Sequence, residues 1–222
     1  MEKGKLIVIE GACDGIGKTT QYNMLSKRLE EDGLEVVKHH FPSYHTPQGA
    51  LVEKYLRGEY GDPNELSPYF INSLYALDRA ATWKESLKDA YDSGKIILLD
   101  RYTTSSIIYQ ASTIKDLEKR KEFIDYIQDF EYNKLEISKP DEVIFLHAPF
   151  DLITLVRNKR KENDGVANDI HERSLDFMKK VYDNALFIAD YLNWQEINCD
   201  NNGEMKSITD IHEDIYKHVK RL

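Results

Sequence analysis

The stretch that decides the fold is Lys5–Thr20, which reads KLIVIEGACDGIGKTT. Its first part holds four consecutive apolar residues, Leu6–Ile9, and this continuous run predicts a strand buried on both faces. A turn with three glycines follows. Beyond the turn, apolar residues recur at helical spacing until Gly33, which can end a helix. The stretch therefore predicts a strand, a tight turn and a helix in direct succession.

The rest of the chain repeats this alternation of short apolar strands and long amphipathic helices. Further strands are expected at Glu35–His39, Lys95–Asp100, Glu142–His147 and Trp194–Asn198. Helices are expected near residues 67–94, 105–113, 116–134, 151–161, 172–192 and 208–222, the first of them capped by Ser67 ahead of Pro68. This order favours an α/β fold, a five-stranded parallel sheet with helices on both faces.

The predicted sheet also indicates where functional residues should lie. Ligands of such sheets bind beyond the carboxyl ends of the strands. The loops after Glu10, His39, Asp100 and His147 are therefore the places to look. No shift in composition marks a boundary, so residues 1–222 are expected to form a single domain.

Composition excludes several classes of protein. The 222 residues carry 30 Lys and Arg against 39 Asp and Glu, a net charge of −9. This acidic balance argues against a nucleic-acid partner or a membrane surface, both of which need a broad basic face. An apolar run near the length of a membrane span is absent from the sequence, and the apolar stretch near the N-terminus is too short for a signal peptide. The two cysteines fit neither a disulfide framework nor a zinc site, so a cytoplasmic location is expected.

The glycine-rich turn has the ending of a phosphate-binding P-loop. Gly15 and Gly17 let backbone N–H groups converge on phosphate oxygens, and the helix that follows presents its positive end. Lys18 can reach the β- and γ-phosphates of ATP, and the Thr19 hydroxyl can bind Mg²⁺. The residues expected to bind ATP are Cys13, Asp14, Gly15, Ile16, Gly17, Lys18, Thr19 and Thr20. The alternative is a glycine-rich turn that only caps a helix.

One position departs from the usual P-loop pattern. Counted back from Gly17, the first glycine of the motif would fall at Ala12, and Gly11 comes one residue too early. Either Ala12 tolerates the turn, or the loop carries a one-residue insertion.

A second polar pair follows another predicted strand, at Asp100-Arg101. A carboxylate at the end of a strand beside the P-loop strand can hold Mg²⁺, directly or through water. The planar guanidinium of Arg101 matches the oxygens of a substrate phosphate. The two residues could equally form a structural ion pair.

Three strings together resemble the thymidylate kinase family, nucleoside-monophosphate kinases that phosphorylate dTMP. They are Asp14–Gln21 (DGIGKTTQ), Leu74–Arg79 (LYALDR) and Asp100–Gln110 (DRYTTSSIIYQ), with Phe41-Pro42 between the first two. The last string is the most discriminating, and the resemblance runs through nearly the whole chain. It implies ATP and Mg²⁺ as cofactors, small-molecule substrates and a homodimer.

The resemblance also implies an acceptor site. The residues it assigns to dTMP binding are Asp14, Phe41, Tyr75, Arg79, Arg101, Ser106 and Tyr109. Tyr75 would stack on thymine, while Arg79 would lie by the base edge and the monophosphate. Tyr75 and Arg79 are four residues apart, so one helical face can present both. Arg101 would be the second contact to the acceptor phosphate.

A basic stretch resembles the lid of these kinases, at about residues 157–172. Family members with a plain glycine at the position of Gly15 supply a catalytic arginine from the lid. Arg157 and Arg160 are the candidates, with Arg160 slightly preferred, beside Lys18 and Arg101 as the other catalytic residues. A solvated charged helix end is the alternative interpretation of this stretch.

The family pattern fails at one acceptor position. An arginine commonly follows Phe-Pro in the family, whereas Ser43-Tyr44 follows here, which leaves the acceptor phosphate to Arg79 and Arg101 or to a nearby residue such as His45. The sequence predicts transfer of the γ-phosphoryl group of ATP to dTMP. A kinase for another pyrimidine nucleotide or a nucleoside, or a non-catalytic nucleotide-binding relative, are the alternatives.

Overall fold

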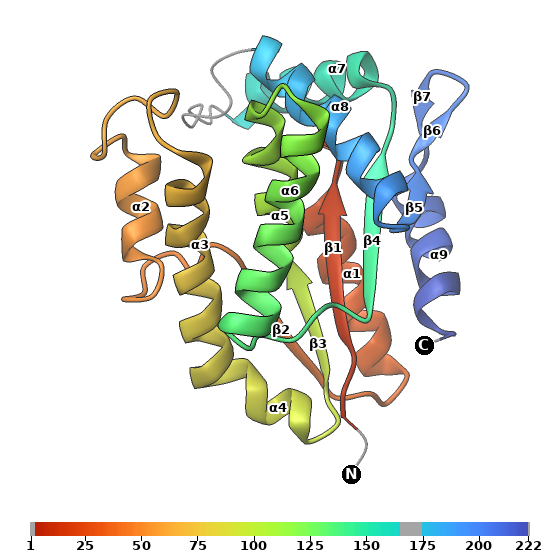
Figure 1. Cartoon of the computed structure of the whole chain (residues 1–222). Helices are drawn as coiled ribbons and strands as arrows, with labels where there is room; N and C mark the ends of the chain where they lie inside the picture. The colour runs from red at the N-terminus through yellow and green to blue at the C-terminus, as the bar shows by residue number, and fades with distance from the viewer. Residues whose placement is uncertain (1–2, 165–174, 222) are drawn as a thin grey trace.

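The computed structural model describes residues 3–164 and 175–221, with only the backbone described for residues 160–164. Five strands form one parallel sheet in the order β2-β3-β1-β4-β5. They are β1 (Leu6–Gly11), β2 (Val36–His40), β3 (Ile96–Asp100), β4 (Glu142–His147) and β5 (Gln195–Asn198) (Figure 1). The predicted α/β fold and all five predicted strands are confirmed.

The central strand β1 is buried at every position because it has a neighbour on each side and helices on both faces. Ile9 pairs with Asp100 of β3 and with Ile144 of β4. The carboxyl ends of β1 and β3 therefore lie side by side, and the loops that follow them meet at one edge of the sheet.

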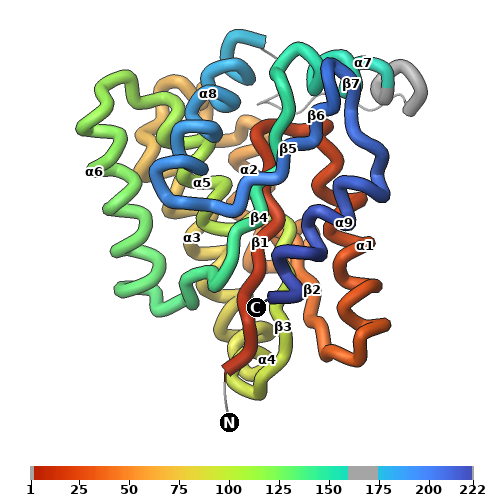
Figure 2. Tube along the Cα trace, turned by 90° about the vertical axis from the view of Figure 1, so that its right-hand side faces the viewer, coloured from red at the N-terminus to blue at the C-terminus, as the bar shows by residue number. Residues whose placement is uncertain are grey.

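Helices cover the two faces of the sheet. Their bounds are α1 (Lys18–Glu31), α2 (Ala50–Leu56), α3 (Pro68–Thr82), α4 (Lys88–Asp92), α5 (Thr103–Tyr109), α6 (Leu117–Gln128), α7 (Phe150–Asp164), α8 (Leu175–Tyr191) and α9 (Ile208–Val219). Ile9 packs in one core cluster with Leu25 of α1, whereas Val8 packs in another with Trp83 and Leu87. Successive β1 side chains thus point to opposite layers, with α1 and α9 on one side of the sheet and α3, α5 and α6 on the other (Figure 2).

The helix expected over residues 67–94 begins as predicted, with the Ser67 side chain accepting from the N–H of Tyr69. A π turn at Trp83–Leu87 separates α3 from α4. A second π turn, Asp129–Lys134, ends α6, and a 3-10 turn at Ala111–Thr113 follows α5. A π turn inserts one extra residue into a helix, which shifts the helical register, and π turns can occur at functional sites.

Two elements were not expected from the sequence. Helix α2 has seven residues and buries only Val52 and Tyr55, so its apolar periodicity is too short to read. A hairpin of β6 (Asp200–Asn201) and β7 (Glu204–Met205) has two-residue strands. Its turn, Asn202-Gly203, has φ of 53° and 91°, and this Asn-Gly pair was the available signal. Within the described ranges, each helix is too short or too polar to cross a membrane.

Candidate functional site

The predicted phosphate-binding turn connects β1 to α1 at the carboxyl edge of the sheet. Gly15 and Gly17 have φ of 98° and 102°, a region that favours glycine, and Gly17 is the N-cap of α1. A side chain at Gly15 would meet Cβ of Arg157 at 3.0 Å. The first N–H groups of α1 have no helical carbonyl to bind, so they and the helix dipole favour an anion here.

Ala12 fits the turn, which decides between the two alternatives left by the sequence. Its φ is not positive, its side chain is fully buried, and its N–H donates to the Leu146 carbonyl at 3.0 Å. Gly11 is the position that needs glycine, because an added Cβ would lie 2.7 Å from Cγ2 of Ile16. The spacing from Ala12 to Gly17 is that of a P-loop without an insertion.

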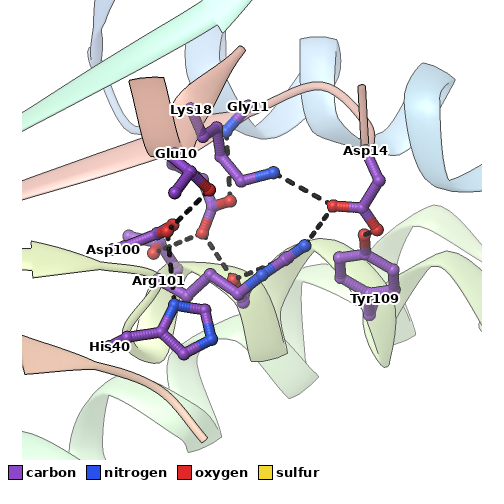
Figure 3. Close-up of polar contacts among 11 residues, drawn as sticks. Glu10, Gly11, Asp14, Lys18, His40, Asp100, Arg101 and Tyr109 are labelled. Atoms are coloured by element: carbon purple, nitrogen blue, oxygen red, sulfur yellow. Dashed lines mark hydrogen bonds and ion pairs between the residues drawn. The ribbon is translucent and has the colours of Figure 1, made fainter. Parts of the chain in front are cut away.

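Asp14 is the centre of a charged network (Figure 3). Its carboxylate accepts from Nζ of Lys18 at 3.1 Å and from the Tyr109 hydroxyl at 3.2 Å, and it forms an ion pair with Arg101. Burial by itself would raise the pKa of Asp14, but the Arg101 and Lys18 cations outweigh it and hold the pKa well below the ordinary value. Asp14 is therefore ionised at neutral pH and ties the turn to β3 and α5.

Asp100 and Thr19 lie together, as a metal site would require. The Thr19 hydroxyl is 3.4 Å from Oδ2 of Asp100, and Nδ1 of His40 is 3.2 Å from the same oxygen. Burial would raise the pKa of Asp100, but the hydrogen bond from His40 and the charge of Lys18 lower it below the ordinary value. Oδ1 of Asp100 is buried and has no hydrogen-bond partner among the described residues. One free carboxylate oxygen beside a hydroxyl suits Mg²⁺, which takes its other ligands from phosphates and water.

Glu10 was not singled out from the sequence, yet it is fully buried beside this network. Its carboxylate accepts from the Thr104 hydroxyl at 2.9 Å, the Ser105 hydroxyl at 2.6 Å and the N–H of Gly11 at 3.1 Å. Glu10 thus joins the end of β1 to the first turn of α5.

A pocket opens beside Asp14 and contains about 580 Å³ of space between atoms, part of it open to solvent. It is lined by Asp14, Phe41, Pro42, Tyr44, Leu56, Tyr75, Arg79, Arg101, Tyr102, Ser105, Ser106, Tyr109 and Gln110. All seven side chains that the resemblance assigned to acceptor binding are among them. These seven residues come from four separate segments of the sequence and meet in one cavity.

Arg79 is held differently from the expected phosphate grip. Its Nε donates to Oε2 of Glu131 at 2.7 Å and its Nη2 to Oε1 of Glu131 at 2.7 Å, and both residues are fully buried. Nη2 also donates to the Ser106 hydroxyl at 2.9 Å. The charge of Arg79 is thus already paired, which differs from the contact to the acceptor monophosphate that the resemblance implied.

Gln110 is a pocket residue that the sequence reasoning passed over, although it ends the most discriminating string. Its side chain is 5% exposed, and its Oε1 has no hydrogen-bond partner within the described part of the chain. An unsatisfied buried amide beside a cavity is costly unless a ligand completes its hydrogen bonds.

The segment after Phe41-Pro42 shows what replaces the family's arginine. Ser43 is buried, where its N–H donates to Asp78 at 2.8 Å and its hydroxyl lies 2.9 Å from Nε2 of His39. Tyr44 lines the pocket, and its ring stacks on His40 with centroids 6.1 Å apart. His45, considered as a substitute cation, has a side chain that is 92% exposed and is not in the pocket wall.

The two lid candidates have different outcomes. Arg157 is buried in α7, contacts Sδ of Met178 through Nη1 and lies against Gly15. The side chain of Arg160 and residues 165–172 of the predicted lid lie outside the described residues.

Similar proteins agree on one family. A family model described as thymidylate kinase matches residues 9–215. The thymidylate kinase of Prochlorococcus marinus (strain NATL2A) is 31% identical over 98% of this chain and 99% of its own length. A probable thymidylate kinase of Thermococcus gammatolerans is 32% identical over 98% of this chain and 97% of its own. A solved structure of thymidylate kinase from Candida albicans has a TM-score of 0.73 at 23% identity, covers 99% of this chain and 92% of its own, and shows the same fold.

Proposed function

The chain belongs to the thymidylate kinase family, and from this premise we propose how its site transfers the γ-phosphoryl group of ATP to dTMP to give dTDP. The chain is an ATP-dependent nucleoside-monophosphate kinase. The observation that carries the proposal is the pocket, in which the seven acceptor residues of the family pattern meet beside the phosphate-binding turn.

The triphosphate of ATP binds the turn of residues 13–20. Gly15 and Gly17 leave the backbone N–H groups open to phosphate oxygens, and Lys18 supplies the cation that reaches the transferred group. Lys18 now contacts Asp14, so ATP binding has to draw its ammonium away from that carboxylate.

Thr19 and Asp100 are the residues that would hold Mg²⁺. The free Oδ1 of Asp100 supports this assignment, because a cation would satisfy an oxygen that otherwise has no partner in the described chain. When bound, Mg²⁺ would offset the charge of the phosphate oxygens that face it.

The acceptor dTMP fills the pocket, with its base against Tyr75 and its phosphate toward Arg101. Ser106 and Gln110 offer a hydroxyl and an amide to the edge of the base, while Phe41 and Tyr109 close the apolar wall. Asp14 would lie by the sugar. The oxygen of the acceptor phosphate is already anionic, so the transfer needs neither a strong base nor a covalent intermediate.

Catalysis then depends on position and charge. Arg101 and Lys18 both contact Oδ1 of Asp14, so the two cations converge where the phosphate-binding turn meets the pocket and can offset the charge of the transferring group. Arg157 is proposed as a further catalytic cation, because its side chain lies against Gly15 of the turn. Arg160 stays a candidate for the same role within a lid at about residues 157–172.

We also propose a homodimer, a single domain over residues 1–222 and a cytoplasmic location. Large apolar side chains are exposed along one helix, α3, with Phe70 and Leu77 at 41% and 50% exposure. A partner copy would bury these side chains. Both cysteines are free thiols, which agrees with a reducing compartment. Sedimentation equilibrium tests the dimer, and a monomer at micromolar concentration would contradict it.

A panel of monophosphates tests the function itself. ADP formation is measured with MgATP and dTMP, dUMP, dCMP or dAMP as acceptor. We expect dTMP to give the highest kcat/KM. A higher kcat/KM with another pyrimidine monophosphate would identify that nucleotide as the acceptor in place of dTMP. ATP binding without turnover of any monophosphate would contradict the proposed kinase activity.

A further inference from the structure

The buried ion pair between Arg79 and Glu131 has no place in the phosphoryl transfer described above. Arg79 lies on α3 and lines the pocket, whereas Glu131 lies in the π turn after α6 and does not. The two residues are 52 positions apart in the sequence, and their contact is bidentate with both N···O distances at 2.7 Å.

The contacts of Arg79 leave few donors for a ligand. A guanidinium has five N–H groups. Nε and one N–H of Nη2 donate to Glu131, and the other N–H of Nη2 donates to Ser106 at 2.9 Å. Nη1 lies 3.4 Å from the Tyr102 carbonyl, which occupies one of its two N–H groups weakly. One N–H of Nη1 is therefore the donor that remains for the pocket.

This arrangement suits a neutral carbonyl better than a phosphate. Arginine grips phosphate with two parallel N–H groups and an unbalanced positive charge. Here the charge is balanced by a fully buried carboxylate, and the bidentate edge is occupied. A single remaining N–H matches one carbonyl oxygen, such as that at C4 of thymine. Cytosine carries an amino group there, so two donors would face each other.

The segment that carries Glu131 is itself fixed to the pocket. The hydroxyl of Tyr132 lies 2.6 Å from that of Thr103 at the start of α5, and the N–H of Ile137 donates to the Glu131 carbonyl at 3.2 Å. Burial alone would lower the pKa of Arg79, but the carboxylate of Glu131 raises it, so the guanidinium stays charged. The guanidinium is thus held by a rigid neighbour rather than by solvent.

We propose that Glu131 is a positioning residue that fixes Arg79 as a single hydrogen-bond donor to the base carbonyl, and so helps the site to select thymine over cytosine. The proposal rests on dTMP being the acceptor and adds to it a residue outside the pocket wall. The base-edge contact of Arg79 itself comes from the family pattern, and the proposal adds the residue that fixes it, while the acceptor phosphate is left to Arg101.

The test compares Glu131→Gln with the unaltered chain by calorimetric titration with dTMP, dCMP and ATP. The glutamine keeps the shape of the side chain but removes its charge and turns an amide donor toward the guanidinium. We expect the Kd for dTMP to rise about tenfold, as for the loss of one charge-assisted contact. The preference for dTMP over dCMP should narrow, while the Kd for ATP stays unchanged. Glu118→Gln, an exposed position on α6, is the matched control and should alter none of these values.

A double-mutant cycle tests whether Glu131 acts through Arg79. In the Arg79→Gln background, adding Glu131→Gln should change the Kd for dTMP by less than about twofold, because the positioned group is already absent. Additive losses would overturn the proposal, as would an unchanged preference for dTMP over dCMP in a folded Glu131→Gln chain. If that variant does not fold, Glu131→Asp replaces it, since it keeps the charge but withdraws the carboxylate by one methylene.

The unaltered chain separates this proposal from the function on which it rests. If it does not bind dTMP, the proposed function and the role of Glu131 both fail. If it binds dTMP with selectivity that Glu131→Gln leaves intact, only the role of Glu131 fails.

Discussion

Lys18 is the residue on which the phosphate-binding turn most depends. Its side chain is only 7% exposed and its ammonium lies 3.1 Å from Asp14, so it has few positions open to it besides that carboxylate and the phosphates of ATP. No other cation on the turn can replace it, because the turn of residues 11–17 carries no Lys or Arg.

Lys18→Met is expected to lower kcat by about 10²–10³-fold, the usual cost of removing one charge-stabilising group. A coupled assay of ADP formation measures the effect. Lys27→Met, on the exposed side of the same helix, is the control and should keep full activity. A comparable fall in kcat in both variants would contradict a specific role for Lys18.

Gly11, which ends β1, and Ala12, which follows it, should respond differently to exchange. Ala12→Gly removes a buried methyl and loosens the unfolded chain, so stability should fall by about 1 kcal/mol while KM for ATP is unchanged. Gly11→Ala places a Cβ 2.7 Å from Ile16 and 3.1 Å from Cγ of Lys18, so it should cost more stability and also raise KM for ATP. Urea unfolding and initial rates test both. A higher kcat in Ala12→Gly would show that alanine in place of the first glycine of the P-loop motif lowers activity.

The N-cap of helix α3 determines the orientation of pocket residues that it does not contact. Its N-cap Ser67 fixes where the helix begins, and its register then determines that Tyr75 and Arg79 share a face toward the pocket. The cap itself lies about two turns from Tyr75 and is not one of the residues that line the pocket.

Ser67→Ala should therefore lower stability by about 1 kcal/mol without changing KM for dTMP. The measurement is the urea midpoint together with initial rates. Ser73→Ala on the same helix is the control, because Ser73 donates back to the Tyr69 carbonyl inside the helix and its loss should be close to neutral. A rise in KM for Ser67→Ala alone would mean that the cap positions the pocket directly.

The sequence predicted those elements whose signal is local. Continuous apolar runs mark β1, β3 and β4, and serine ahead of proline marks the start of α3. The π turns after Thr82 and Gln128 leave no local signal, because they preserve helical composition and change only the register. The pair of Arg79 and Glu131 could not be predicted either, since it depends on how the π turn after α6 packs against α3 and not on either segment alone.

At the scale of the whole molecule, the seven acceptor residues could be named before the fold because they occur at family spacing. What the sequence left out is the set of polar groups that support them. Glu10 and Glu131 are buried carboxylates whose partners come from other elements, and Gln110 is a buried amide whose Oε1 has no partner in the described chain, so tertiary packing determines their roles. His40, to which the sequence analysis assigned no role, contacts the candidate metal ligand Asp100.

Stability should fall as the pH drops from 7.5 to 5.5. Burial lowers the pKa of His39, His147 and His212 below the ordinary value near 6.5, so below that pH the unfolded chain binds protons that the folded chain resists. Asp14 and Asp100 add nothing in this range, because their lowered pKa values leave them ionised in both states down to about pH 4.

Urea unfolding at pH 7.5, 6.5 and 5.5 measures this slope. His212 lies on α9, away from the pocket, so His212→Gln should flatten the slope without altering dTMP turnover. A slope of opposite sign in the unaltered chain would contradict the lowered pKa values.

The turn after β3 has an evolutionary consequence. Arg101 follows that strand with φ of 69°, a conformation that costs a side-chain-bearing residue about 1 kcal/mol relative to glycine. A chain selected for robustness alone would carry glycine at this position. The presence of arginine in this conformation indicates that its contribution to function outweighs its cost in stability. Substitutions designed to stabilise the fold should therefore leave Arg101 unchanged.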